Sequence, residues 1–392
     1  MDNDATPIVQ PSTKRIPLLL KIYAVALIVL SLITLPASVL MGLYLPTLAE
    51  SNSALQGTSM AIGIVEVVLS AISSVGGIVL GIALLRDRRR HAREALEVLI
   101  ALYVGYLICD IMVVGIGATN LSSVVHLVFL IALMAYIDPS LSEERALQRK
   151  LHELETEQRA DDGTLGRDPS GKGYIELDFF NLFWIFVVCC VLGLAIEVVY
   201  HMVVVDPGVY QDRAGMLYGP FSPIYGIGAV LMTIALNRFH KANVVVIFLV
   251  SAVIGGAFEY AVSWFMQFAF GITAWDYTGT FLSIDGRTNG MFMAMWGVLG
   301  CLWVKLLLPR MLRLVNLIPW KWRYGLTAVC AALMFVNGAM TLMSLDCWYQ
   351  RTAGLAPTNA VEQFCAEHYD DEFMEERFQS MSINPDNATR AK

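Results

Sequence analysis

Two glutamates lie inside apolar runs in the second half of this 392-residue chain. Glu197 lies near the end of the run 179–204, and Glu259 lies in the later half of the run 244–270. A charged side chain inside a bilayer costs about 2.5–3.5 kcal/mol on insertion scales, so such residues mark functional sites by default. Two carboxylates of this kind can line a polar substrate site, act as a general acid and base, or form a structural network with arginines. All three interpretations stay open at the level of the residues.

Polar and aromatic residues that belong with these glutamates follow in short stretches. Arg213 and Arg287 are the natural ion-pair partners of the two carboxylates. The candidate substrate-binding residues are Glu197, Arg213, Tyr218, Pro220, Pro223, Tyr225, Glu259, Tyr260, Trp275, Asp276, Tyr277 and Arg287. The sequence shows no metal-ligand spacing, no histidine-rich cluster and no nucleophile beside a base, so we predict no catalytic, metal or cofactor site.

The stretch Gln211–Gly226, QDRAGMLYGPFSPIYG, cannot form a regular transmembrane helix. Pro220 and Pro223 remove backbone donors, and its glycines permit conformations closed to other residues. Irregular backbone at membrane depth is tolerated only where protein buries it or where it lines a wet cavity. We therefore place the functional site here, and we expect Gly219 to tolerate valine less well than Gly81, which lies in a plain helical run.

The composition predicts a membrane protein whose helices position these residues. The chain is 56% hydrophobic and 16% charged, with a mean hydropathy of +0.59, which is outside the globular range. Apolar runs of about 20 residues cross a bilayer. We predict an all-α polytopic bundle of about nine spans, over residues 16–45, 60–85, 96–118, 121–137, 179–204, 220–236, 244–270, 289–308 and 324–345. The sixth span is short and enters through two prolines, so it is predicted to be broken or re-entrant.

Basic residues alternate between the predicted loops. One set of loops holds Lys14, Arg15, Arg86, Arg88, Arg89, Arg90, Arg93, Arg145, Arg149, Lys150, Arg238, Lys241, Arg310, Arg313, Lys321 and Arg323. The alternating loops hold far fewer, and the loop 46–59 holds none. Since lysine and arginine favour the cytoplasmic side, we expect a cytoplasmic-membrane protein with its N-terminus inside and its C-terminus outside.

Polar stretches divide the chain into predicted domains. These are a four-span bundle over 1–138, a cytoplasmic linker over 139–178, a membrane domain over 179–320, a final span over 321–345 and an acidic external tail over 346–392. In the linker, Ser140–Glu143 is a capping-box pattern that predicts a short helix. In the first bundle, Asp110 and His126 lie deep in neighbouring spans, where they are able to pair. In the tail, Cys365 falls on the outer side with Cys347, where a disulfide is permitted but not required.

The linker segment Gly166–Lys172 matches the first seven positions of a phosphate-binding P-loop. The eighth position is Gly173, which lacks the hydroxyl that reaches magnesium, and a P-loop also needs a strand before it and a helix after it. We therefore predict no nucleotide binding at this segment.

From Phe179 to about Leu314 the chain resembles the putative ABC-transporter type IV, or CmpB-type, family of bacterial membrane proteins. The residues that carry the resemblance are Glu197, the run Arg213–Gly226, the pair Glu259-Tyr260, the turn Trp275-Asp276-Tyr277 and the stretch Ile284–Arg287, in that order. The chain departs from the family pattern at Ala214, which separates Arg213 from Gly215. The resemblance implies a permease for an unknown substrate and, because this sequence shows no ATPase segment, a separate ATPase subunit.

Two other functions remain open beside the permease. One is a membrane-embedded enzyme that acts on a lipid or envelope precursor, with the paired carboxylates as acid and base. The other is a non-catalytic membrane sensor or assembly factor that uses the acidic tail as its external contact. In each case we expect the lipid bilayer as surroundings and no nucleic acid as a partner. The sequence leaves the oligomeric state undetermined.

Overall fold

The computed structural model describes residues 18–51, 56–86, 92–137, 154–160 and 162–388. Almost all regular structure in these residues is helical, and the one small sheet has two strands of two residues each. The chain forms two compact units, residues 1–152 with 391–392 and residues 153–390. The predicted capping box at Ser140–Glu143 lies outside the described residues, whereas residues 154–160 form a short helix.

The described residues of the first unit form four apolar helices: α1 (Leu18–Ser51), α2 (Thr58–Leu85), α3 (Ala92–Val114) and α4 (Ala118–Ile137). Its core is aliphatic and includes Leu27, Leu80, Leu84 and Leu130, all of which are buried. Gly81 of α2 faces α1 closely, since a Cβ there would lie 2.9 Å from the carbonyl oxygen of Ala24. Gly81 is therefore a packing position, because small residues let neighbouring membrane helices approach. That valine is tolerated less well at Gly219 than at Gly81 stays a prediction.

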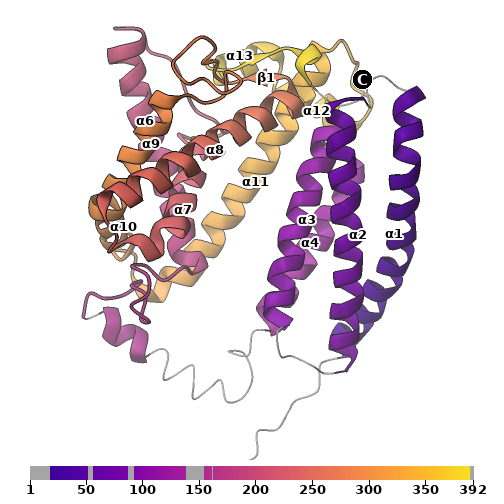
Figure 1. Cartoon of the computed structure of the whole chain (residues 1–392), viewed down its shortest axis with the longest axis horizontal. Helices are drawn as coiled ribbons and strands as arrows, with labels where there is room; N and C mark the ends of the chain where they lie inside the picture. Colours follow the sequence, from indigo (N-terminus) through magenta and orange to yellow (C-terminus); the bar gives the residue numbers. More distant parts are fainter. Residues whose placement is uncertain (1–17, 52–55, 87–91, 138–153, 161, 389–392) are drawn as a thin grey trace, which may run out of the picture. The chain divides into compact units, whose positions relative to one another are not determined.

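The second unit contains the short helix at residues 154–160 and the elements that follow it. These are α6 (Phe179–Tyr200) with the π-helix η3 (His201–Val205), α7 (Pro223–Leu236) with η4 (Asn237–Phe239), α8 (Val244–Phe270), β1 (Ile272–Thr273), α9 (Gly290–Leu302) with the π-helix η5 (Trp303–Leu307), α10 (Leu308–Val315), α11 (Trp320–Thr352), α12 (Ala360–His368), α13 (Asp371–Arg377), β2 (Ser382–Ile383) and η6 (Pro385–Asn387). Within this unit, β1, α12 and α13 lie together at one end (Figure 1).

Seven of the described helices are long and apolar enough to cross a membrane. Two shorter apolar helices are Asn120–Met134 in α4 and Pro223–Phe239, which comprises α7 and η4. This agrees with the predicted polytopic bundle. The stretch between Asp206 and Ser222 is not helical, which confirms that the prolines and glycines there prevent a regular span. The helix α7 begins at Pro223, at a position where the missing proline N–H has no intrahelical partner to lose.

Glycines allow the helices of the second unit to pack at short range around the irregular stretch. A Cβ at Gly193 of α6 would overlap the ring of Tyr225, which lies in the first turn of α7. A Cβ at Gly255 of α8 would overlap the indole of Trp296 in α9. These contacts fix α6 against α7 and α8 against α9.

The chain beyond α11 folds back onto the second unit. β2 pairs antiparallel with β1, which directly follows α8. Next to this pair, the N–H of Asn384 donates to the carbonyl oxygen of Gly271 at 2.8 Å. Gly271 has φ of +64°, in the left-handed region that glycine favours at the end of a helix. The acidic tail is thus a folded layer rather than an extended arm.

Candidate functional site

Glu197 near the end of α6 forms an ion pair with Arg213 of the irregular stretch. The Arg213 Nε donates to the Glu197 Oε1 at 2.8 Å, and both side chains are about one-quarter exposed. The Tyr225 hydroxyl also hydrogen-bonds to the Glu197 carboxylate. The predicted pairing of Glu197 with Arg213 is therefore present. It ties the last turn of α6 to the stretch that leads into α7.

Glu259 of α8 has a different environment. Its side chain is buried, with 6% of the residue surface exposed. The Tyr277 hydroxyl donates to Oε1 at 3.0 Å, and the Thr288 hydroxyl donates to Oε2 at 2.9 Å. Both donors are neutral hydroxyls from the loop between α8 and α9. Among the described residues, no ion pair to Glu259 occurs.

Tyr277 lies near both carboxylates. Besides its bond to Glu259, it lies within electrostatic range of both Glu197 and Arg213. Burial raises the pKa of the Tyr277 phenol well above its usual range, and the Glu259 charge adds to this effect. Tyr277 therefore keeps its proton at neutral pH and remains a donor to Glu259. We call Glu197, Arg213, Tyr225, Glu259 and Tyr277 the carboxylate cluster.

The expected pairing of Arg287 with Glu259 is not observed. The Arg287 Nη1 reaches the Ser263 hydroxyl at 3.4 Å, and the guanidinium carbon lies 5.8 Å from the ring centre of Tyr260 and 5.5 Å from that of Phe268. Arg287 is thus held by cation–π contacts on aromatic faces of α8. The Ser263 hydroxyl and the two rings hold this guanidinium, while Glu259 accepts its hydrogen bonds from Tyr277 and Thr288.

The other predicted residues of this loop organise its backbone. The Trp275 indole donates to the carbonyl oxygen of Arg287 at 2.8 Å, and Tyr260 of α8 donates to the Asp285 carboxylate at 2.8 Å. Asp276 is exposed and accepts the hydroxyl and N–H of Thr278, which together lower the pKa of its carboxyl. Asp276 therefore shapes a turn and lies apart from the carboxylate cluster.

The proline-rich part of the irregular stretch is anchored by α11. The Tyr218 N–H donates to the Asn337 side-chain oxygen at 3.1 Å, and the Asn337 amide donates back to the Tyr218 carbonyl oxygen at 2.8 Å. The Leu217 N–H donates to the Thr341 hydroxyl at 2.8 Å. Pro220 is exposed, while Pro223 packs on Gly215, where a Cβ would lie 2.9 Å from the proline ring. The backbone of this stretch is satisfied by side chains, as irregular structure in a membrane requires.

Arg377 of α13 holds the same stretch from the other side. Its Nη1 pairs with the Asp212 carboxylate at 2.8 Å. Its Nε and Nη2 donate to the carbonyl oxygen of Met216 at 2.9 and 2.7 Å, and Nη2 also donates to that of Gly219 at 2.6 Å. The fork of an arginine suits several acceptors at once. The tail therefore stabilises the geometry of the irregular stretch.

The sequence analysis did not predict several residues of this site. Asn337 and Thr341 could have been found, because they lie one helical turn apart in an apolar run, a spacing that indicates a polar face of the helix. Thr288 directly follows Arg287 in the polar loop. Arg377 carries no local signal, since it is one basic residue in an acidic segment.

Two further sequence features have clear structural outcomes. In the P-loop-like segment, Asp168 itself accepts the N–H groups of Ser170 and Gly173, at 2.8 and 2.6 Å, so the loop fills its own anion-binding positions. Asp110 accepts a hydrogen bond from Asn120 and not from His126, whose ring packs 4.6 Å from that of Tyr103.

Cys347 and Cys365 are both buried and carry free thiols. The two thiols hydrogen-bond to each other, one from the end of α11 and one from α12. The contact ties the tail to the last long helix without a covalent bond. Formation of a disulfide between them stays a prediction.

Comparison with protein families identifies the region that holds this cluster. Residues 184–342 match the family described as putative ABC-transporter type IV. The match contains every member of the carboxylate cluster and extends into α11, whereas Arg377 lies beyond it. Neither the curated proteins nor the solved structures gave a match. The family match and the apolar helices together support a membrane protein of transporter type.

Proposed function

We propose that this protein is a permease of the cytoplasmic membrane, and that the carboxylate cluster is the place where its substrate binds. The observation that carries the proposal is the state of Glu259, a buried carboxylate that accepts two neutral hydroxyls and, among the described residues, has no ion pair. A charge at membrane depth requires compensation. Glu197 receives it from Arg213, whereas Glu259 has two neutral hydroxyl donors among the described residues.

The chemistry of Glu259 favours a positively charged substrate group. A carboxylate offers about four lone-pair positions, and the two hydroxyl donors use two of them. An ammonium or guanidinium group would fill the remainder and neutralise the charge. Tyr277 hydrogen-bonds to Glu259 and lies within electrostatic range of the Glu197–Arg213 pair, so we propose that binding at one carboxylate affects the other.

The family match supports ATP hydrolysis as the energy source of the proposed transport. We propose that a separate ATPase subunit docks on the cytoplasmic loops, with the N-terminus inside and the C-terminus outside. The carboxylate cluster and the folded tail would then face the outer side. In this arrangement the tail, through Arg377, holds the outer wall of the binding site.

The test compares cells that produce the wild-type protein, Glu259→Gln or the control Glu50→Gln, which changes an exposed carboxylate at the end of α1. Amine-bearing and guanidine-bearing solutes are measured inside and outside the cells by mass spectrometry, at matched membrane levels of each protein. We expect the wild type and the control to redistribute at least one cationic solute, and Glu259→Gln to behave like cells without the protein. Redistribution by Glu259→Gln at the wild-type level would contradict the proposal.

Two further measurements separate the alternatives. Depletion of cellular ATP with the membrane potential maintained should abolish redistribution if an ATPase subunit drives it. Purified protein is also incubated with a total lipid extract. Conversion of a lipid that disappears in Glu259→Gln would favour the membrane-embedded enzyme instead.

A further inference from the structure

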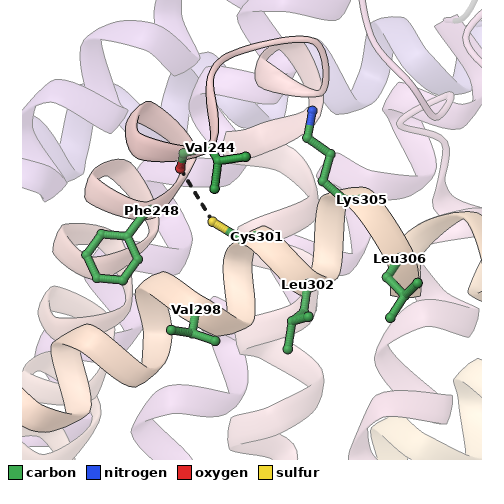
Figure 2. A pocket seen from close by; sticks show the side chains of 7 residues that line it. All are labelled: Val244, Phe248, Val298, Cys301, Leu302, Lys305 and Leu306. Atoms are coloured by element: carbon green, nitrogen blue, oxygen red, sulfur yellow. Dashed lines mark hydrogen bonds between the residues drawn. The ribbon is translucent and has the colours of Figure 1, made fainter.

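An apolar groove lies between α8 and α9 at the end of the second unit opposite the tail. Its walls are Val244, Phe248, Val298, Cys301, Leu302, Lys305 and Leu306, and its volume is about 510 Å³ (Figure 2). Several wall residues are half exposed, including Val244 at 56% and Val298 at 53%. The groove therefore opens at the surface of this unit and is not an interior void.

A π-helix places a cation at one end of the groove. Within η5, Trp303 and Val304 are buried, and the Trp303 indole donates to the Thr233 hydroxyl at 2.9 Å. Lys305 and Leu306, the next two residues, face outward. Short π-helical turns of this kind frequently occur at functional sites. Here the turn leaves an ammonium group beside an otherwise apolar wall.

The ammonium of Lys305 has neutral acceptors, and not carboxylates, as its contacts among the described residues. It donates to the carbonyl oxygen of His240 at 2.7 Å and lies 3.5 Å from that of Ala242. These acceptors are neutral, and an ammonium has three donors. Among the described residues, Lys305 has no ion pair.

The surrounding segments add positive charge. Residues 237–243 and 303–315 contain no acidic residue. Their basic residues are Arg238, Lys241, Lys305, Arg310 and Arg313. Basic residues at the edge of a membrane attract anionic lipid head groups by about 1 kcal/mol each. An apolar groove that ends at such a group of cations has the polarity of a phospholipid: an acyl chain below and a phosphate above.

We propose that this groove binds one anionic phospholipid of the bilayer, with an acyl chain along Val298–Leu306 and the phosphate on Lys305. The stretch of nine residues from Val298 to Leu306 covers about 12 Å along the helix axis, enough for a large part of an acyl chain. Cys301 lies in the middle of this path, where its thiol donates to the carbonyl oxygen of Val244 at 3.5 Å (Figure 2). The site is separate from the carboxylate cluster and does not depend on the proposed transport activity.

The test is native mass spectrometry of the full-length protein in detergent. Phosphatidylglycerol and phosphatidylcholine with identical acyl chains are added in equal amounts, and the ratio of the two bound lipids is measured. We expect the wild type to retain phosphatidylglycerol in excess. Loss of one cation should lower the ratio about five-fold in Lys305→Gln, while Lys305→Arg keeps it. The control Lys21→Gln removes one cation from α1 and should leave the ratio unchanged.

A second variant tests the acyl path independently of charge. Val298→Trp places a large ring in the groove at a half-exposed position, which protects the fold, and it should reduce retention of both lipids. A wild-type ratio near one would overturn the proposal, as would an unchanged ratio in Lys305→Gln. If Lys305→Gln does not fold, lipid retention by Val298→Trp at the wild-type level would overturn it instead.

Discussion

Arg377 and Asp212 are 165 residues apart in the chain, yet their side chains form an ion pair at 2.8 Å. The same guanidinium donates to the carbonyl oxygens of Met216 and Gly219. The short helix α13 thereby holds the irregular stretch that supplies Arg213 to the carboxylate cluster and leads into α7 with Tyr225. A polar tail beyond the family match is thus part of the structure that supports the candidate site.

The first prediction concerns this clamp. Arg377→Gln should lower the free energy of unfolding by about 2–3 kcal/mol, because charge-assisted hydrogen bonds to a half-buried carboxylate and to backbone carbonyls are lost. Arg377→Lys should recover only part of the loss, since an ammonium lacks the fork that reaches three acceptors. Thermal unfolding of the purified protein measures both, with the exposed Arg310→Gln as the control. Equal melting temperatures for Arg377→Gln and the control would show that the clamp contributes nothing.

The second prediction concerns the pair of Glu197 and Arg213. A double-mutant cycle with Glu197→Gln and Arg213→Gln should give a coupling energy of at least about 1 kcal/mol, because each single change leaves a partly buried charge unpaired. Partial exposure of both side chains keeps the value below that of a fully buried pair. Folded yield and thermal stability of the four proteins measure the coupling. Strictly additive effects would be incompatible with the ion pair.

The third prediction concerns Glu259 and Arg287. Arg287 contacts aromatic rings, whereas Glu259 accepts hydrogen bonds from two hydroxyls. The effects of substituting the two residues on stability should therefore be independent. Arg287→Gln should therefore not restore any folded protein lost in Glu259→Gln, and the coupling energy should stay within about 0.5 kcal/mol. Glu259→Gln should keep most of its folded yield, since glutamine has the same volume, while solute redistribution is lost. Rescue by the double substitution would make Glu259 a structural partner of Arg287 and remove it from the proposed site.

The fourth prediction concerns the close packing of α6 and α7. A Cβ at Gly226 would overlap the Cys190 sulfur and lie 2.7 Å from the carbonyl oxygen of Phe186. Gly226→Val should thus destabilise the protein by about 1–3 kcal/mol or prevent folding. Gly325 in α11 is the matched control, because a Cβ at that position would meet no described atom within 4 Å. Similar yields of folded Gly226→Val and Gly325→Val would argue against the tight helix contact.

The fifth prediction concerns orientation. In a chain whose seven natural cysteines are replaced, a single cysteine at Ser51 should react with a membrane-impermeant thiol reagent in intact cells. A single cysteine at Ser142, in the predicted linker outside the described residues, should not react until the cells are opened. Labelling at Ser142 but not at Ser51 would invert the topology. The proposed docking side for an ATPase would then be wrong as well.

The sequence alone determined the helices and the place where they break. An apolar run that crosses a bilayer must satisfy its backbone hydrogen bonds internally, and an α-helix does so. The predicted run 244–270 and the helix α8 accordingly have the same bounds. Pro220, Pro223 and the glycines around them act on their own backbone, and the helix accordingly starts only at Pro223. The pairing of Glu197 with Arg213 was also predictable, since few opposite charges were near each other in an apolar setting.

Only the tertiary structure decided which groups share a contact across long sequence separations. Tyr277 and Thr288, and not Arg287, donate hydrogen bonds to the Glu259 carboxylate. The geometry of the folded loop selects these partners, and opposite charge alone does not predict them. Gly81 proved to be a packing position because the surface it faces belongs to another helix. The fold of the tail brings Arg377 within hydrogen-bond distance of Asp212, Met216 and Gly219. Local patterns fix the elements, whereas contacts between distant elements depend on how their surfaces meet.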